Sequence, residues 1–107
     1  GAEVDSSQDS IRESPALDFA ASGGHTDIIE YLISQGAAIN RRERIAGCTP
    51  LNFAVFQNHF DAVKVLLEHG ADVNAACLGG TALQAAEGAG NTAIADLLRE
   101  YGATKTE

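Results

Sequence analysis

Two histidines each lie two residues before an aspartate, in the segments "HTD" and "HFD". An imidazole beside a carboxylate can form half of an acid–base pair or bind a divalent metal, so His25 with Asp27 and His59 with Asp61 are the first candidates for chemistry. The two segments are embedded in similar sequence, which indicates that the residues recur because the sequence repeats. We expect a structural role for both pairs and no metal site.

Two glycine-rich stretches, "GGT" at 79–81 and "EGAGNT" at 87–92, are candidates for a phosphate-binding loop. Neither has the Gly-Lys-Ser/Thr ending that follows a strand in such loops, so both are interpreted as turns. The sequence also lacks a recognisable set of nucleophile, base and orienting group. We therefore predict no cofactor and no enzyme activity in this chain.

The composition narrows the choice of partner. Of 107 residues 45% are hydrophobic but only 6% are aromatic, with no Trp and no Met, so the core must consist mainly of small aliphatic side chains. Fifteen acidic against seven basic residues give a net charge of -8, which repels nucleic acid and anionic lipid. No run of 18 apolar residues is present. Neither nucleic acid nor a membrane is an expected partner.

The elements that position these residues recur about every 33 residues. The repeat is marked by three leucines and three glycines in the same phase: Leu17, Leu51, Leu83, Gly36, Gly70 and Gly102. In each unit, apolar residues at helical spacing occur twice, as in "TPLNFAVFQ" and "DAVKVLLEHG", and the second stretch stops at a glycine. Each unit is thus predicted to be two short antiparallel helices that bury their apolar faces only by stacking on neighbouring units.

These phrases resemble the ankyrin repeat. The family phrase Thr-Pro-Leu-His-x-Ala is matched by "TPLNFA" at 49–54, and more loosely by "PALDFA" at 15–20 and "TALQAA" at 81–86. The phrase that follows it in the family is matched by "GHTDIIEYLISQGAAIN" and "NHFDAVKVLLEHGADVN". The family's histidine is replaced by Asp18, Asn52 and Gln84, all polar enough for the same local role.

The resemblance implies one all-α repeat domain, a solenoid of stacked antiparallel helix pairs with projecting β-hairpin loops. Residues 15–47, 48–79 and 80–107 would be three repeats, the last a C-terminal cap, and residues 1–14 the hairpin of a preceding repeat. An array cut at this point would expose the upstream face of its first helix pair. The expected state is a monomer, or part of a longer array.

The segment "NRRERIAG" at 40–47 holds three of the seven basic residues, where the family places a hairpin tip. Its guanidinium groups could pair with carboxylates or phosphates of a partner, or with neighbouring acids such as Glu43 in a solvated loop. On the first interpretation, Arg42, Arg44 and Ile45 contact an acidic or phosphorylated protein segment that carries an apolar anchor.

The concave face supplies the other predicted contacts. Phe56 and Gln57 lie at positions that the family leaves variable, although Phe56 could instead turn into the core between repeats. The small Ser22 in the equivalent place of the first repeat would leave room beside Phe56 for a ligand. Leu78 is a further predicted contact with the partner.

The cysteines are expected to be unpaired. Cys48 and Cys77 lack Cys-x-x-Cys spacing, and a disulfide needs Cβ atoms about 4 Å apart, closer than adjacent repeats are at most positions. Cys48 is then a further candidate for contact with a partner. Unpaired cysteines and the absence of an Asn-x-Ser/Thr sequon favour an intracellular (cytoplasmic or nuclear) protein.

Several functions fit this organisation. We favour a non-catalytic protein-binding module; a regulatory or substrate-recruiting segment of a larger enzyme, and an array that only spaces other domains, are the alternatives. Asn74, in "LLEHGADVN", resembles an acceptor of asparaginyl hydroxylases, but a role in the hairpin's own hydrogen bonding is the simpler interpretation.

Overall fold

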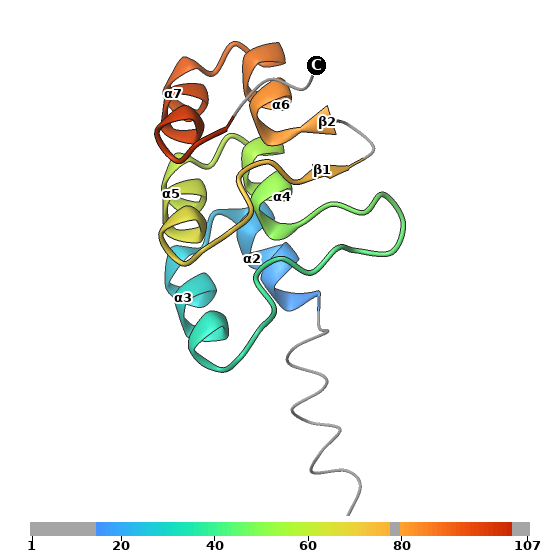
Figure 1. Cartoon of the computed structure of the whole chain (residues 1–107). Helices are drawn as coiled ribbons and strands as arrows, with labels where there is room; N and C mark the ends of the chain where they lie inside the picture. The colour runs from blue at the N-terminus through green and yellow to red at the C-terminus, as the bar shows by residue number, and fades with distance from the viewer. Residues whose placement is uncertain (1–14, 78–79, 104–107) are drawn as a thin grey trace, which may run out of the picture.

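The computed structural model describes residues 15–77 and 80–103 as three helix pairs stacked side by side (Figure 1). The pairs are α2 (Ala16–Gly23) with α3 (Thr26–Ser34), α4 (Pro50–Phe56) with α5 (Phe60–Glu68), and α6 (Ala82–Gly88) with α7 (Thr92–Glu100). The inner helices α2, α4 and α6 form one row, and the outer helices α3, α5 and α7 form a second. The predicted solenoid of antiparallel helix pairs is confirmed.

The loops between the pairs project from the side of the inner helices (Figure 1). The loop before α6 contains a short antiparallel pair, β1 (Ala76–Cys77) and β2 (Gly80–Thr81), in which Ala76 faces Thr81 and Cys77 faces Gly80. The loop before α4 is closed by a backbone bond from the Glu43 N–H to the Cys48 carbonyl, at 2.9 Å. None of the helices in the described residues is long and apolar enough to cross a membrane.

Two inner helices begin with reciprocal caps. Thr49 at α4 and Thr81 at α6 each accept a bond from the backbone N–H three residues on, while the side chains of Asn52 and Gln84 accept one from the threonine N–H. The amide side chains thus take the local role expected of them. Asn52 is fully buried and also donates from Nδ2 to the Ala75 carbonyl, at 3.2 Å, which ties α4 to the next loop.

Left-handed residues make the tight turns within each pair. Gly24 and Gly90 both have φ of 73°, and Asn58, at the equivalent position of the middle pair, has φ of 61°. Asparagine is among the few side chains that tolerate this conformation, so the turn survives the loss of its glycine. The second helix of each pair can therefore fold back along the first.

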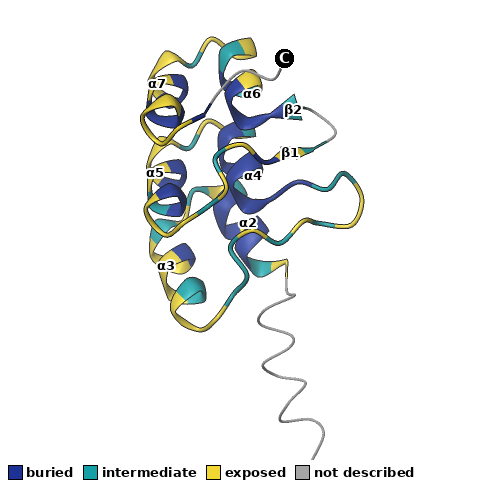
Figure 2. Ribbon diagram, in the orientation of Figure 1, coloured by how far each residue is buried: buried dark blue, intermediate teal, exposed yellow. Residues whose placement is uncertain are grey.

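The core lies between the two rows of helices and continues from pair to pair (Figure 2). Three alanines in the same phase, Ala20, Ala54 and Ala86, are 4%, 0% and 0% exposed. Their small side chains let the inner helices approach closely, while leucines and isoleucines fill the space toward the outer row. The composition, rich in small aliphatic residues, is explained by this packing.

Candidate binding surface

The loop 40–48 is organised around one carboxylate. Glu43 accepts hydrogen bonds from the backbone N–H groups of Ile45 (2.9 Å), Ala46 and Cys48 (3.4 Å), and the Gly47 N–H donates to the Glu43 carbonyl at 3.0 Å. These donors, those of Ile45 and Ala46 first, hold the pKa of Glu43 below its usual value. Glu43 therefore fixes the shape of the tip. The solvated-loop interpretation, in which Glu43 neutralises the arginines, does not hold for this residue.

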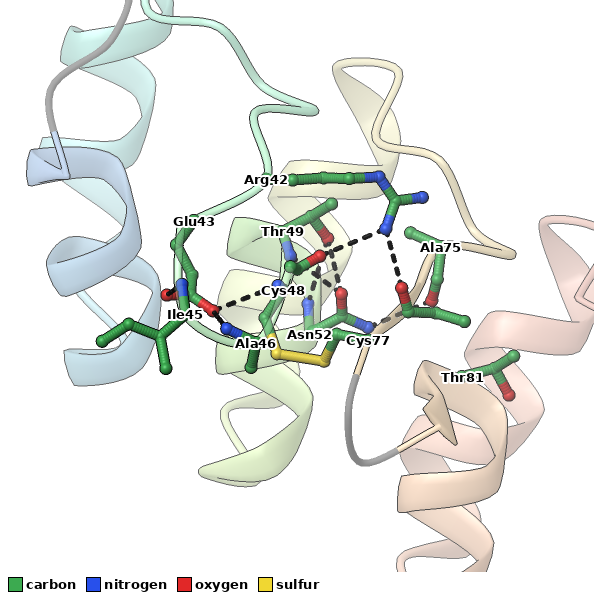
Figure 3. The surroundings of a disulfide bond; sticks show 12 residues. Arg42, Glu43, Ile45, Ala46, Cys48, Thr49, Asn52, Ala75, Cys77 and Thr81 are labelled. Atoms are coloured by element: carbon green, nitrogen blue, oxygen red, sulfur yellow. Dashed lines mark hydrogen bonds between the residues drawn. A yellow bond between two sulfur atoms is a disulfide. The ribbon is translucent and has the colours of Figure 1, made fainter.

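The three arginines of this loop have different surroundings. Arg41 pairs with Asp18 of α2 at 3.1 Å. Arg42 donates from Nη1 to the Gly47 carbonyl, at 3.1 Å, and to the Ala76 carbonyl of the next loop, at 2.7 Å, as Figure 3 shows. Arg42 is thus a brace between adjacent loops. Within the part of the chain that the structure describes, Arg44 is exposed and has no hydrogen bond or ion pair.

The expectation of two unpaired cysteines is wrong: Cys48 and Cys77 form a disulfide, with Cα atoms 4.7 Å apart (Figure 3). The two residues are not equivalent positions of the repeat, since they are separated by 29 residues. Cys48 closes one loop and Cys77 opens the turn of the next, where the two loops converge. Cys48 is only 3% exposed and bridged, which removes it from the predicted contact surface. An intracellular location stays a prediction, without the support of unpaired cysteines.

The tip of the loop carries the most exposed apolar side chain on this surface. Ile45 is 93% exposed, directly beside Arg44. Its backbone N–H is bound by Glu43, so the side chain projects from an ordered loop. Arg44 and Ile45, two of the predicted contact residues, are therefore both exposed at the tip of this loop.

The inner helices offer a second apolar surface beside the loops. Phe56 is half-buried, which lies between exposure on the concave face and burial in the core between repeats. Gln57 is exposed at the end of α4. Ser22 is half-buried on α2. Leu78 lies outside the described residues. Sequence reasoning missed Phe19, which is 72% exposed on α2; its spacing of three from Ser22 places it on the same helix face.

The histidine–aspartate pairs have structural positions. His25 and His59 immediately precede α3 and α5, and the His59 ring lies against Gly24 in the turn of the preceding pair, where a Cβ atom at Gly24 would be 2.7 Å from Nδ1. Within residues 15–77 and 80–103, no three His, Cys, Asp or Glu side chains gather in a way that could hold a metal ion.

Asp18 is the one strongly perturbed acid described. Burial beneath the loop raises the pKa of its carboxyl group from 3.8 to about 6, partly opposed by the charge of Arg41. Asp18 is equivalent to Asn52, and Arg41 to Ala75. In both repeats a hydrogen bond joins the inner helix to the loop, but the helix donates it from Asn52 and accepts it at Asp18. A carboxylate cannot donate to a carbonyl, and a guanidinium supplies the donor instead.

A comparison of the sequence with models of protein families agrees with this architecture. The family model described as "Ankyrin repeats (3 copies)" matches residues 1–77 and 17–107, which together span the chain. No curated protein matches the sequence.

The perturbed Asp18 predicts a pH-dependent stability. Between about pH 4 and pH 6 the folded chain holds a proton on Asp18 that the unfolded chain has lost, so stability should fall as pH rises through this window and level off above it. Across this pH window the free energy of unfolding of the wild type should decrease by on the order of 2–3 kcal/mol more than that of Asp18→Asn. Urea unfolding at several pH values measures this, with Asp61→Asn as the control for charge removal. Parallel pH profiles for wild type and Asp18→Asn would contradict it.

The disulfide predicts a redox-dependent stability. Reduction should lower the free energy of unfolding by about 3–4 kcal/mol, because the bridge closes a loop across 29 residues of sequence. Thermal melts with and without dithiothreitol, with alkylation and mass measurement to count thiols, test this. A Cys48→Ser, Cys77→Ser variant is the control and should melt identically in both conditions. A wild-type protein with two free thiols under oxidising conditions would show that the bridge does not form.

Proposed function

The chain belongs to the ankyrin-repeat family, and on that premise we propose that it binds a protein segment through the tip of the loop 40–48 and the adjoining inner helices. Ankyrin repeats are generally protein–protein interaction modules, and their domains are generally non-catalytic. The finer assignment of surface and ligand is supported by the exposure, charge and bracing of the described residues.

The observation that carries the proposal is the exposure of Ile45 on a braced loop. A side chain 93% exposed gains no stability from the fold, yet the loop beneath it is closed by the Glu43 bonds, the Arg42 bridge and the disulfide. A loop already ordered loses little conformational entropy on binding. Ile45 is therefore suited to enter an apolar pocket of a partner, or to cover an apolar residue of a bound segment.

The charge of the tip indicates the kind of segment bound. Arg44 is exposed and unpaired among the described residues, in a chain of net charge -8. An anionic group is repelled by most of the molecule and attracted at this point, which orients an approaching ligand. The ligand proposed is an acidic or phosphorylated segment with one apolar residue next to the negative charge.

The inner helices extend this surface. Phe19, exposed on α2, and Phe56, half-buried on α4, lie in the row of helices from whose side the loops project (Figure 1). An aromatic group on such a surface offers a large contact area with few rotatable bonds. The same surface would serve equally in a regulatory or recruiting segment of a larger protein, because recognition depends only on the tip and the inner helices.

We predict that a random-peptide library selected on the immobilised chain yields peptides with Asp or Glu beside an apolar residue. For the best peptide, Arg44→Glu and Ile45→Ser should each raise Kd at least tenfold, a loss of about 1.4 kcal/mol. Isothermal titration calorimetry gives Kd, and a synthetic phosphoserine version tests whether phosphate replaces the carboxylate.

The matched control is Lys64→Glu, which makes the same charge reversal at an exposed cation on the outer helix α5. It should change Kd less than about threefold, because it lies away from the tip. Peptides without acidic character, or equal losses for Lys64→Glu and Arg44→Glu, would contradict the assignment of the tip as the binding surface.

A further inference from the structure

The disulfide joins two loops that are each closed without it. The loop 40–48 is closed by the hydrogen bonds to the Glu43 carboxylate, and the next loop is closed by the pairing of β1 with β2. Within the described residues, neither Cys48 nor Cys77 belongs to the apolar cluster that holds the helix pairs together. Opening the bridge therefore leaves the core and both loop closures in place and removes a link between the loops.

The two cysteines differ in their access to solvent. Cys48 is 3% exposed, directly before the residue that caps α4, whereas Cys77 is half-buried on β1. Thiol–disulfide exchange requires that an attacking thiolate reach one of the two sulfur atoms. Cys77 is therefore the sulfur that a dissolved thiol can attack, and Cys48 is the leaving group.

Arg42 places a positive charge next to the bridge. Its Nη1 atom donates to the carbonyls of Gly47, at 3.1 Å, and Ala76, at 2.7 Å, which directly precede the two cysteines. Figure 3 shows the guanidinium group and the disulfide between the same two loops. A cation beside a cysteine favours its thiolate form. Arg42 thus favours the departure of Cys48 from the bridge as a thiolate.

The bridge holds the base of the exposed tip. Cys48 follows Ile45 by three residues, and its carbonyl accepts the backbone bond from Glu43, at 2.9 Å, that closes the loop. With the bridge open, the bond from Arg42 to the Ala76 carbonyl still joins the two loops, but it is exposed and water competes for both of its partners. The tip should then move more freely relative to the next loop.

We propose that the Cys48–Cys77 bridge is a thiol-exchange site, at which a low-molecular-weight thiol opens the bridge in the folded protein and loosens the tip. The thiolate sulfur bonds to Cys77 Sγ, the S–S bond breaks, and Cys48 leaves as a thiolate that takes a proton from water. A second thiolate attacks the added sulfur and releases Cys77 in the same way. Both cysteines are then reduced, and two small thiols are oxidised to one disulfide.

The consequence for binding rests on the function proposed above. A loosened tip must be ordered when a ligand binds, and this ordering costs conformational entropy. The oxidised chain should therefore bind an acidic peptide more tightly than the reduced chain does.

The first test locates the exchange. The oxidised full chain is treated briefly with reduced glutathione, quenched with N-ethylmaleimide and digested with trypsin, which places Cys48 in the peptide 45–64 and Cys77 in the peptide 65–99. We expect glutathione on Cys77 and maleimide on Cys48, at least about fivefold over the reverse isomer. Below the unfolding transition, the rate of opening should change less than about twofold per molar urea. Glutathione mainly on Cys48, or a rate that rises roughly fivefold per molar as global unfolding requires, would overturn the proposal.

The second test measures the mobility of the tip without any ligand. On reduction, the ¹⁵N order parameters of Ile45 and Ala46 should fall from above about 0.8 to below about 0.7, while those of α4 and α5 stay high. The Cys48→Ser, Cys77→Ser variant is the matched control. It should have the values of the reduced chain and should not respond to glutathione. Unchanged values at the tip, or a loss of order that includes α4 and α5, would contradict a local switch.

The third test measures binding of the selected acidic peptide. Reduction should raise Kd at least about fivefold, and the double serine variant should bind like the reduced chain in both conditions. Equal Kd values for the oxidised and reduced chains would exclude control of binding by the bridge. If the oxidised chain binds no acidic peptide, or if Arg44→Glu leaves Kd unchanged, the proposed function fails. The exchange site is then judged by the first two tests, which need no ligand.

Discussion

No helix pair in this molecule can bury its apolar surface alone, and the stacking of pairs is the constraint on which the rest of the structure depends. Helices of 7 to 9 residues are too short to be stable in isolation. The fully buried side chains, such as Leu51, Leu66 and Ile94, each 0% exposed, belong to one core that continues through all three pairs. The repeat in the sequence exists because each pair must present the same two faces to its neighbours.

Stacking also determines how the projecting loops are held. Each loop follows an outer helix and returns to the next inner helix, so its base lies against an inner helix that it does not belong to. The buried polar ties there are Asn52 to Ala75 and Asp18 to Arg41, with opposite donor and acceptor. Between the loops, Arg42 and the disulfide add two further bridges. The exposed tip at Arg44 and Ile45 thus rests on a base that the stacked core positions.

Much of the fold could be predicted from the sequence because the residues that determine it recur at a regular period. The recurring leucines and glycines indicated helix pairs, turns and stacking, and the structure has all three. The amides at Asn52 and Gln84 were correctly expected to take over a local hydrogen-bonding role, since the threonines that they bond lie three residues before them.

The candidate site was less predictable, because its contacts join positions that the repeat does not relate. Cys48 and Cys77 meet through the convergence of two loops of different length, which periodicity does not report. Arg42 was expected to face a partner but also donates to two backbone carbonyls. Glu43 was considered as a partner for the arginines but accepts hydrogen bonds from the backbone of its own loop. Phe19 could not be recognised from the repeat, because it is exposed although its equivalent, Phe53, packs on the core in the next unit.

Each helix pair is stabilised by the neighbouring pairs that cover it. Native-state hydrogen exchange, resolved by residue, tests this most directly. Amides of α3, which buries one residue, should exchange faster than the equivalent amides of α5, which buries four and has a pair on either side. Equal protection in α3 and α5 under conditions of local opening would contradict it, and would mean that each helix pair is held mainly by contacts within itself.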